Sequence, residues 1–343
     1  MSFKRLDQED IVISADSITA PAWTGNVVNL TSFYTSSDQK IGVSGDYYLN
    51  VYQTTYTNSN AAIQFSVAYG HLTGGGTENI NDGVSGYSPS RLIYGQYRTL
   101  INGTEEENLS FGGVTPNSIY PISIERARYK EKIFPGSLRL ILSGSAGDRK
   151  LELTDNSNYV TTETFTDAGR VYELISGSLG VKTSSPKDSG ALGYSASSGS
   201  YGKLYPDIGL ILLNGDALNL TPANGGITLG TVVTVDTDGA NPSKIVDALN
   251  RGKVFTLRGE ETVSSNYVFV RARNSEFNYS TNPSNITGSG ELRHSVMIDT
   301  PQSYVTAVGL YNDNNDLLAI AKLSRPLLKD FTKEALIRIK LDY

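Results

Sequence analysis

The strongest constraint on the fold is a period-two alternation of apolar and polar side chains, clearest towards the end of the sequence. In residues 335–343, ALIRIKLDY, one face carries Ile337, Ile339, Leu341 and Tyr343, and the other carries the charged side chains of Arg338, Lys340 and Asp342. Residues 303–311 and 316–324 alternate too, and they flank Asn312–Asn315, which is typical of a tight turn. Such alternation indicates half-buried strands, so this region predicts a β-hairpin and a final strand paired in a sheet.

The composition extends this prediction to the whole chain. Its 343 residues include 34 Gly and 21 Tyr, and only 19% are charged. Tyr, Thr and Val favour strands, whereas Gly and Asn favour turns. We therefore expect a mainly β protein with two β-rich subdomains of sandwich-like sheets and two short helices.

Two segments depart from the strand pattern. A helix is expected near 89–101, because Ser88 can cap it and Pro89 suits its first position. A second helix is expected near 242–250, with Asn241 as its cap.

The division into segments follows these elements. Residues 1–118 are predicted to form an N-terminal arm and a β-rich region with the first helix. Residues 119–230 are predicted to form a central β domain, and 231–343 a C-terminal β domain with the second helix. Both chain ends read as strands, which suggests that they share one sheet.

Charge is distributed unevenly along the chain. The formal net charge is −6, which disfavours nucleic-acid binding. Residues 1–119 carry 5 basic and 11 acidic side chains, whereas 322–343 carry 6 basic and 3 acidic ones. An acidic head and a basic tail suit a chain that meets other chains, and solvated charge on two surfaces is an equal alternative.

The segment 122–133, ISIERARYKEKI, concentrates positive charge. Read as a strand, it places four basic side chains on one sheet face. That face either meets an acidic neighbour or suppresses edge pairing. The candidate interface residues are the cations of the N-terminal arm, this segment and the C-terminal tail: Lys4, Arg5, Arg126, Arg128, Lys130, Lys132, Lys322, Arg325 and Lys329.

No pattern predicts catalysis. There is no cysteine, and the two histidines, His71 and His294, lie in no recognisable catalytic constellation. Two Asp-containing turns, Asp236–Gly239 and Asp313–Asp316, lack the spacing of a calcium loop. We expect no enzymatic activity, no cofactor and no bound metal. No apolar run is long enough to span a membrane, and the N-terminus has no apolar signal region.

The stretch RNSEFNYSTNPSN at 273–285 resembles a ligand loop or a glycan acceptor at first sight. Without a secretion signal, the sequon at Asn278 is interpreted as a product of composition. The spacing of Phe277 and Tyr279 predicts a strand with both rings on one face, which ends before Pro283.

Ordered sequence blocks carry a family resemblance. They are SPSRLIYGQYRTLI, ISIERARYKEKIFPGSLRLIL, YGKLYPDIGLILLNGDAL, FVRARNSEFNYSTNP, SYVTAVGLYNDNNDLLAIAKLSRPLLKD and ALIRIKLDY. Over residues 88–343 the chain resembles virion structural proteins of contractile-tailed bacteriophages, including phages that infect cyanobacteria. The resemblance implies a tail or baseplate component without enzymatic activity.

The expected function is thus a structural part of a phage tail, with a baseplate wedge protein as the first hypothesis. A receptor- or carbohydrate-binding tail module, a neck or capsid decoration protein, and an enzyme acting on envelope polysaccharide are the alternatives. The expected partners are other tail and baseplate proteins, with self-association open, and neither nucleic acid nor a small-molecule substrate is expected. The expected location is the virion, assembled in the host cytoplasm.

Overall fold

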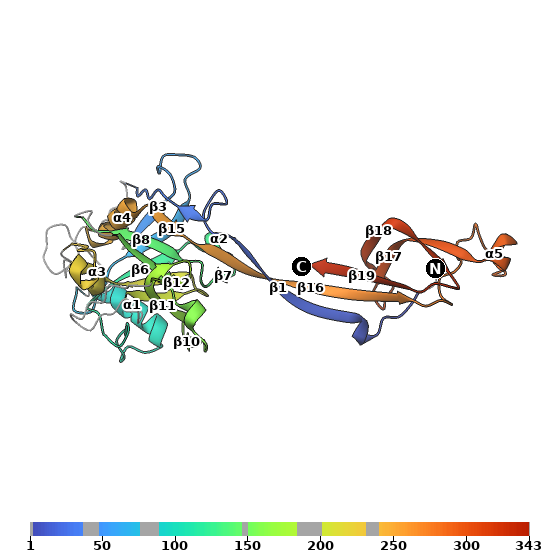
Figure 1. Cartoon of the computed structure of the whole chain (residues 1–343), viewed down its shortest axis with the longest axis horizontal. Coiled ribbons are helices and arrows are strands. Elements are labelled where there is room, and N and C mark those ends of the chain that lie inside the picture. The colour runs from blue at the N-terminus through green and yellow to red at the C-terminus, as the bar shows by residue number, and fades with distance from the viewer. Residues whose placement is uncertain are drawn as a thin grey trace. The chain divides into compact units, whose positions relative to one another are not determined.

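The computed structural model describes residues 3–36, 48–75, 89–145, 150–183, 201–230 and 240–342. Antiparallel strands dominate these residues, which confirms the prediction of a mainly β protein. The chain divides into a larger unit, Ile18–Glu261, and a smaller unit, Met1–Ser17 with Thr262–Tyr343. Both ends of the chain thus belong to the smaller unit (Figure 1).

A 13-stranded sheet forms the larger unit, in the order β2-β15-β8-β9-β11-β13-β14-β6-β4-β3, with β10 and β12 on β11 and β5 on β6. The strands are β2 (Asn29–Leu30), β3 (Tyr48–Tyr52), β4 (Ile63–Ala68), β5 (Gly70–His71), β6 (Ser118–Ile124), β8 (Arg139–Ser143), β9 (Lys150–Asp155), β10 (Thr164–Thr166), β11 (Gly169–Ser178), β12 (Val181–Lys182), β13 (Gly202–Tyr205), β14 (Leu210–Asn214) and β15 (Val254–Thr256). Beyond β2, Tyr34 exchanges two backbone hydrogen bonds with Tyr52 of β3, at 3.0 and 2.8 Å. This bridge links the two ends of the strand order, so the sheet curls around its own interior.

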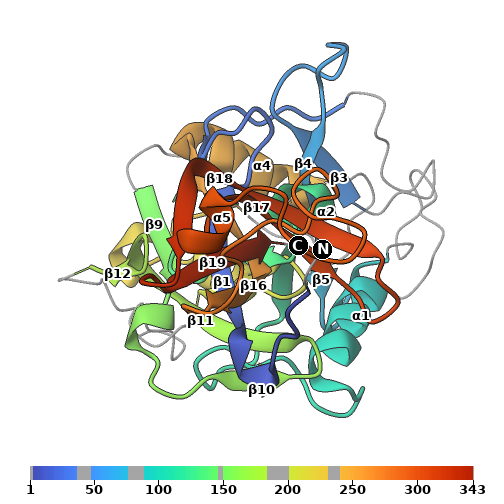
Figure 2. The ribbon, with the colours of Figure 1, turned by 90° about the vertical axis from the view of Figure 1, so that its right-hand side faces the viewer.

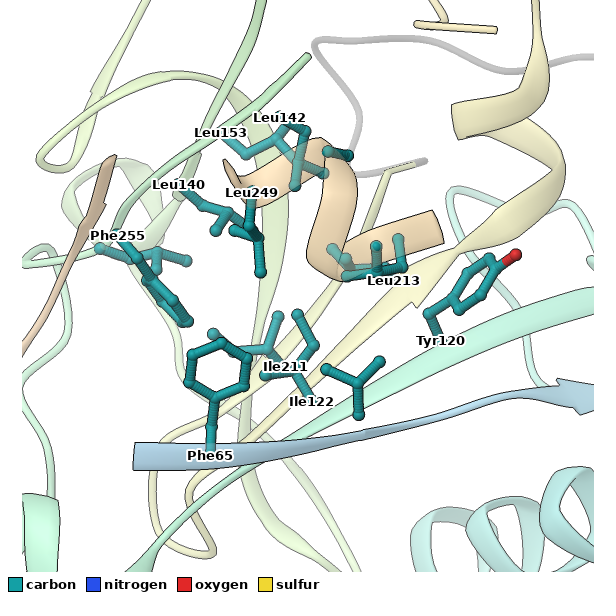
Figure 3. Packing of buried hydrophobic residues seen from close by; sticks show 14 of the residues in the cluster. Phe65, Tyr120, Ile122, Leu140, Leu142, Leu153, Ile211, Leu213, Leu249 and Phe255 are labelled. Carbon is teal, nitrogen blue, oxygen red and sulfur yellow. The ribbon is translucent and has the colours of Figure 1, made fainter. Parts of the chain in front are cut away.

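Alternation along the strands fills two cores on opposite faces of this sheet. In β14, Ile211 and Leu213 join the main core, whereas Leu210 and Leu212 join a second cluster. The main core is lined by aliphatic side chains from most of the strands and by Phe65 and other aromatic rings (Figure 3). A strand buried on both faces explains why β14 reads as a continuous apolar run.

Helices close the two cores. The helix α1 (Ser90–Asn102) lies beside β5 and covers the second cluster, and α4 (Ala240–Gly252) lies beside β3 and β4 and packs into the main core (Figure 2). Both confirm the helices expected near 89–101 and 242–250. Shorter helical turns are α2 (Arg126–Tyr129), α3 (Gly215–Asn219), η1 (Gln8–Asp10), η2 (Ser157–Tyr159) and η4 (Pro222–Asn224).

The smaller unit is built around β16 (Arg258–Ala272), which begins in the larger unit and pairs there with β7 (Lys132–Ile133). Further along, β16 has β1 (Ile11–Pro21) on one side and β19 (Ala335–Asp342) on the other. The two chain ends therefore share one sheet, as suggested. This pairing divides each of the expected segments 1–118 and 231–343 between the two units.

The rest of the smaller unit is the expected hairpin. β17 (Gln302–Tyr311) and β18 (Leu317–Asp330) form a two-stranded sheet, preceded by the short helix α5 (Val296–Asp299). The Asn312 side chain accepts hydrogen bonds from the backbone N–H groups of Asn314 and Asp316 at 3.0 and 2.7 Å. This Asn-centred turn is the local reason for the hairpin.

Two sequence interpretations lie outside the described residues: Ser88 as a helix cap and Asp236–Gly239 as a turn.

Candidate assembly surface

The sheet of the smaller unit has one apolar face. Val268 and Val270 of β16 lie opposite Ile339 and Ile337 of β19 in the antiparallel register. Directly opposed β-branched side chains stabilise a sheet, and this explains the strict alternation of ALIRIKLDY. However, among the described residues of this unit only Val268, Ala272 and Ile339 are buried hydrophobic side chains.

Many other apolar side chains of the smaller unit are exposed. Fifteen large ones are exposed among its described residues: Phe3, Ile11, Val12, Ile13, Tyr279, Val296, Ile298, Tyr304, Tyr311, Leu317, Leu318, Ile320, Leu327, Phe331 and Leu336. The described residues of the larger unit show the opposite balance, with 49 buried hydrophobic side chains and 12 large exposed ones. The described residues of the smaller unit thus bury little apolar surface and leave a large apolar area exposed, which makes this unit the candidate assembly surface.

Unpaired strand edges accompany this surface. Within the described residues, β1 and β19 end the strand order of one sheet, and the β17–β18 hairpin has no third strand. Two-stranded hairpins are marginally stable in water unless another element packs on them. Free edges and exposed apolar side chains together favour contact with a further strand or sheet.

Lys329 lies at the centre of a buried polar cluster. Its side chain is fully buried, and its Nζ donates hydrogen bonds to Asn278 Oδ1 at 2.7 Å and to the carbonyl oxygens of Asn274 and Asp330, each at 3.0 Å. Asn278 is also buried and donates from its Nδ2 to Asn274 O at 2.7 Å. The ammonium thus ties the segment 273–285 to β18, and it is not an exposed interface charge.

This cluster corrects the interpretation of 273–285. The segment is not a strand: Phe277 has a φ of 57° and is partly buried, whereas Tyr279 is 50% exposed. Asn278, which alternation placed on the outer face, is the most buried of the three. The hydrogen bond of Asn278 with Lys329 outweighs the local preference of the aromatic residues for a strand, and the partner lies 51 residues away in the sequence.

The two N-terminal candidates differ from each other. Lys4 Nζ donates to the carbonyl oxygen of Arg271 at 2.5 Å and pairs with Glu276 Oε2 at 2.9 Å, which fastens the arm to the end of β16. The Glu276 carboxylate accepts hydrogen bonds from the Arg273 backbone and from Lys4, and these bonds, the first most strongly, hold the pKa of Glu276 below its ordinary value. Arg5 is exposed and makes no ion pair among the described residues.

The basic segment at 126–132 does not form the expected strand face. Arg126 and Arg128 lie in α2, Lys130 has a φ of 55°, and only Lys132 lies in a strand. Tyr129 and Ile133 are both buried, and the packing of the Tyr129 ring accompanies the helical turn. The Tyr129 ring occupies space left by Gly209, where an added Cβ would come within 2.3 Å of it.

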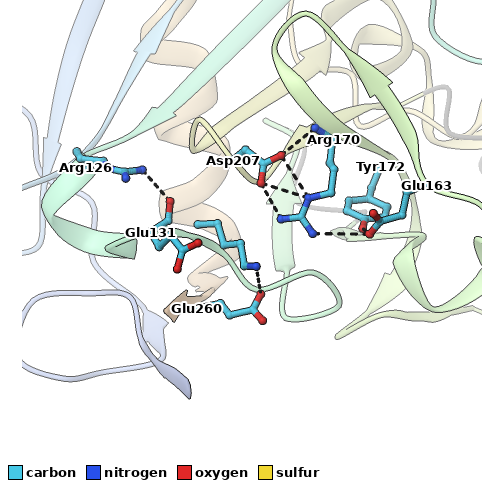
Figure 4. Close-up of polar contacts among 8 residues, drawn as sticks. Arg126, Glu131, Glu163, Arg170, Tyr172, Asp207 and Glu260 are labelled. Carbon is cyan, nitrogen blue, oxygen red and sulfur yellow. Dashed lines mark hydrogen bonds and ion pairs between the residues drawn. The ribbon is translucent and has the colours of Figure 1, made fainter. Parts of the chain in front are cut away.

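All four cations of that segment have partners within the larger unit. Arg126 donates to Glu131 O at 2.9 Å (Figure 4). Arg126 also lies 4.9 Å from the centroid of the Tyr129 ring, and Lys132 lies 3.7 Å from Glu260. Two further contacts complete the set: Arg128 donates to Thr24 Oγ1, and Lys130 pairs with Glu261. The four positive charges are therefore largely engaged inside the chain.

Lys322 and Arg325 of β18 are different. Both are exposed, and neither makes an ion pair with any other described residue. The pairing of β18 with β17 is interrupted here, because Val305 lies opposite Leu327 and Ala307 opposite Lys322. These two cations are the predicted interface residues that the structure leaves available on a strand of the smaller unit.

Charged groups in the larger unit build a separate polar cluster. Arg170 Nη2 donates to Asp207 Oδ1 at 2.6 Å, and Tyr172 OH donates to Glu163 Oε1 at 2.8 Å (Figure 4). Burial raises the pKa of Asp207, but hydrogen bonds from Arg170 outweigh this effect and leave that pKa below its ordinary value. Burial, followed by the hydrogen bond to Glu163, raises the pKa of Tyr172 to about 12. The cluster fixes the turn between β10 and β11 against the loop that carries Asp207.

The described residues offer little for chemistry. They contain no group of three or more His, Cys, Asp or Glu side chains that could hold a metal ion. Burial lowers the pKa of His71, whose Nδ1 accepts a hydrogen bond from the backbone N–H of Thr73 at 3.2 Å. No helix in the part of the chain described is long and apolar enough to cross a membrane. Comparison with protein-family models, curated proteins and solved structures gave no match for this chain.

Proposed function

We propose that this protein is a structural component of a bacteriophage tail, most specifically a baseplate wedge protein, that acts through protein–protein contacts during virion assembly. The observation that carries the proposal is the smaller unit, which exposes fifteen large apolar side chains and buries three hydrophobic ones among its described residues. The resemblance of the ordered sequence blocks to virion proteins supplies the biological setting.

The division of the chain supports an assembly role. The larger unit has two filled cores and can serve as a folded platform. The smaller unit offers strand edges and apolar side chains that gain burial only against another chain. Such a unit becomes ordered and stable on assembly, which suits a part that must join its neighbours in a set order. We assign the protein no catalytic step and no cofactor.

The proposal is tested by the protein composition of purified virions and by the position of this chain in the particle. We expect mass spectrometry of purified virions to detect this chain, and cryo-electron microscopy to place its density in the baseplate. Absence from the mature particle would refute the proposal. Density at the neck, on the capsid or at a fibre tip would identify the alternative structural or receptor-binding role.

A matched pair of phage variants tests the surface itself. Leu318→Ser with Ile320→Ser changes two exposed side chains of β18, and we expect it to block assembly of infectious particles. Leu92→Ser with Leu100→Ser changes two exposed side chains of α1 in the larger unit and should leave particle yield unchanged. Equal yields from the two variants would remove the smaller unit from the assembly surface.

A further inference from the structure

Two strand edges of the smaller unit carry opposite charge. Asp7, Glu9 and Asp10 lead into β1, and none of these three makes an ion pair with another described residue. Lys322 and Arg325 lie in β18 and also lack an ion-pair partner among the described residues. The chain therefore carries an acidic and a basic edge segment whose charges are not neutralised within it.

The two segments also match in their apolar residues. The acidic residues are followed directly by Ile11, Val12 and Ile13, which are exposed. Lys322 is preceded by Leu318 and Ile320, which are exposed as well, whereas Ala319 and Ala321 between them and Lys322 are partly buried. In an antiparallel alignment with Val12 opposite Ile320, Asp10 falls opposite Lys322. Asp7 and Glu9 belong to the turn η1 and its cap just before β1, and they add negative charge at the same end of the strand. Charge and apolar character thus agree in one register.

We propose that the smaller unit binds a second copy of this chain by antiparallel pairing of the β1 edge of one copy with the β18 edge of the other. In the described residues β1 ends its sheet and β18 has only β17 beside it, so both backbone edges are available (Figure 1). The pairing joins the sheet β19-β16-β1 of one copy to the hairpin of the next. The inference rests on the proposed function, since it names a partner for the same surface.

Charge makes this contact selective. A basic edge repels a basic strand and attracts an acidic one. Copies of the chain offer such an acidic strand at equal concentration, whereas the basic edges of two copies repel each other. The pairing is therefore heterologous: β1 of one copy meets β18 of another, and each copy has one edge of each kind.

Charge reversal tests the proposal on the full-length protein. Wild-type chain should self-associate in sedimentation velocity, and association should weaken as salt is raised. Asp7→Lys with Asp10→Lys, and separately Lys322→Glu with Arg325→Glu, should each raise the dissociation constant by at least about tenfold. Mixing the two double variants should restore association, because each acidic edge then meets a basic one. The control, Glu105→Lys with Glu106→Lys in an exposed turn of the larger unit, should associate like wild type.

A cross-link reports the register. The chain has no cysteine, so Val12→Cys and Ile320→Cys each carry a single thiol. Mixed and oxidised, they should form a disulfide-linked pair, whereas Leu92→Cys mixed with Ile320→Cys should not. A wild-type chain that stays monomeric at its highest soluble concentration, or a mixture of charge variants that does not associate, overturns the inference. Either result leaves the proposed function standing if virions still contain the protein.

Discussion

Replacement of Lys329 by methionine should release the segment 273–285 from β18. The change keeps an unbranched side chain that is one atom shorter and removes the ammonium that donates to Asn274 O, Asn278 Oδ1 and Asp330 O. A buried acceptor left without its donor costs about 1–3 kcal/mol. Asn274 O keeps the hydrogen bond from Asn278 Nδ2, so Asn278 Oδ1 is the acceptor of the segment that loses its donor, and we expect a local destabilisation of about 1–3 kcal/mol.

Native-state hydrogen exchange is the appropriate assay, because the effect is confined to the smaller unit. Backbone amides at the end of this segment, those of Asn285 and its neighbour Ile286, which both donate to Asn282 O, should exchange at least about fivefold faster in Lys329→Met. Amides of the larger unit should keep their wild-type rates. The matched control is Lys333→Met, which removes an exposed lysine 3.5 Å from Asp330 and should leave exchange of the segment unchanged. Equal rates in wild type and Lys329→Met would show that the buried ammonium does not hold the segment.

Three further predictions concern the larger unit. Phe255→Ala should cost about 3–5 kcal/mol of stability in urea unfolding followed by the fluorescence of Trp23, the single tryptophan, whose Nε1 donates to Phe255 O at 2.7 Å. Burial raises the pKa of Glu173 to about 7, above that of the unfolded chain, so stability should fall as pH rises from about 4.5 through about 7. Glu173→Gln should flatten this fall in thermal melts, and an unchanged pH profile would contradict the assignment. Gly252→Ala should destabilise α4, because its Cβ would lie 1.9 Å from Ile141 O; a circular-dichroism melt identical to wild type would exclude this clash.

Elements with strong local signals were predictable from the sequence. The helix at 89–101 carries an apolar stripe, and Gly103 after it adopts the left-handed conformation at a φ of 69° that ends a helix well. The hairpin of β17 and β18 follows from alternation on both sides of an Asn-rich turn. In these cases the residues that specify the element are its own neighbours in the sequence, so the pattern contains the information.

Other parts depend on distant partners that a single sequence does not show. The segment at 126–132 alternates like a strand, yet the space beside Gly209 accepts the Tyr129 ring and a helical turn results. Lys329 looked like one more surface charge of a basic tail, and only its contact with Asn278 shows that it is internal. Nothing in the sequence distinguishes the buried Lys329 from the exposed Lys322 on the same strand.

Alternation alone gave no sign in the sequence that the apolar strand faces of the smaller unit are left poorly covered. A period of two shows that one face of a strand is apolar, but it does not show what covers that face. In the larger unit the covering partner is the same sheet curled around its core, and α1 and α4 cover the remaining faces. In β1 and β18 the same pattern occurs without a covering element among the described residues, and exposed charges of opposite sign lie beside it. The proposed pairing would give these locally well-specified strands their remaining burial, and the sign of the charge near each edge would then select the partner strand.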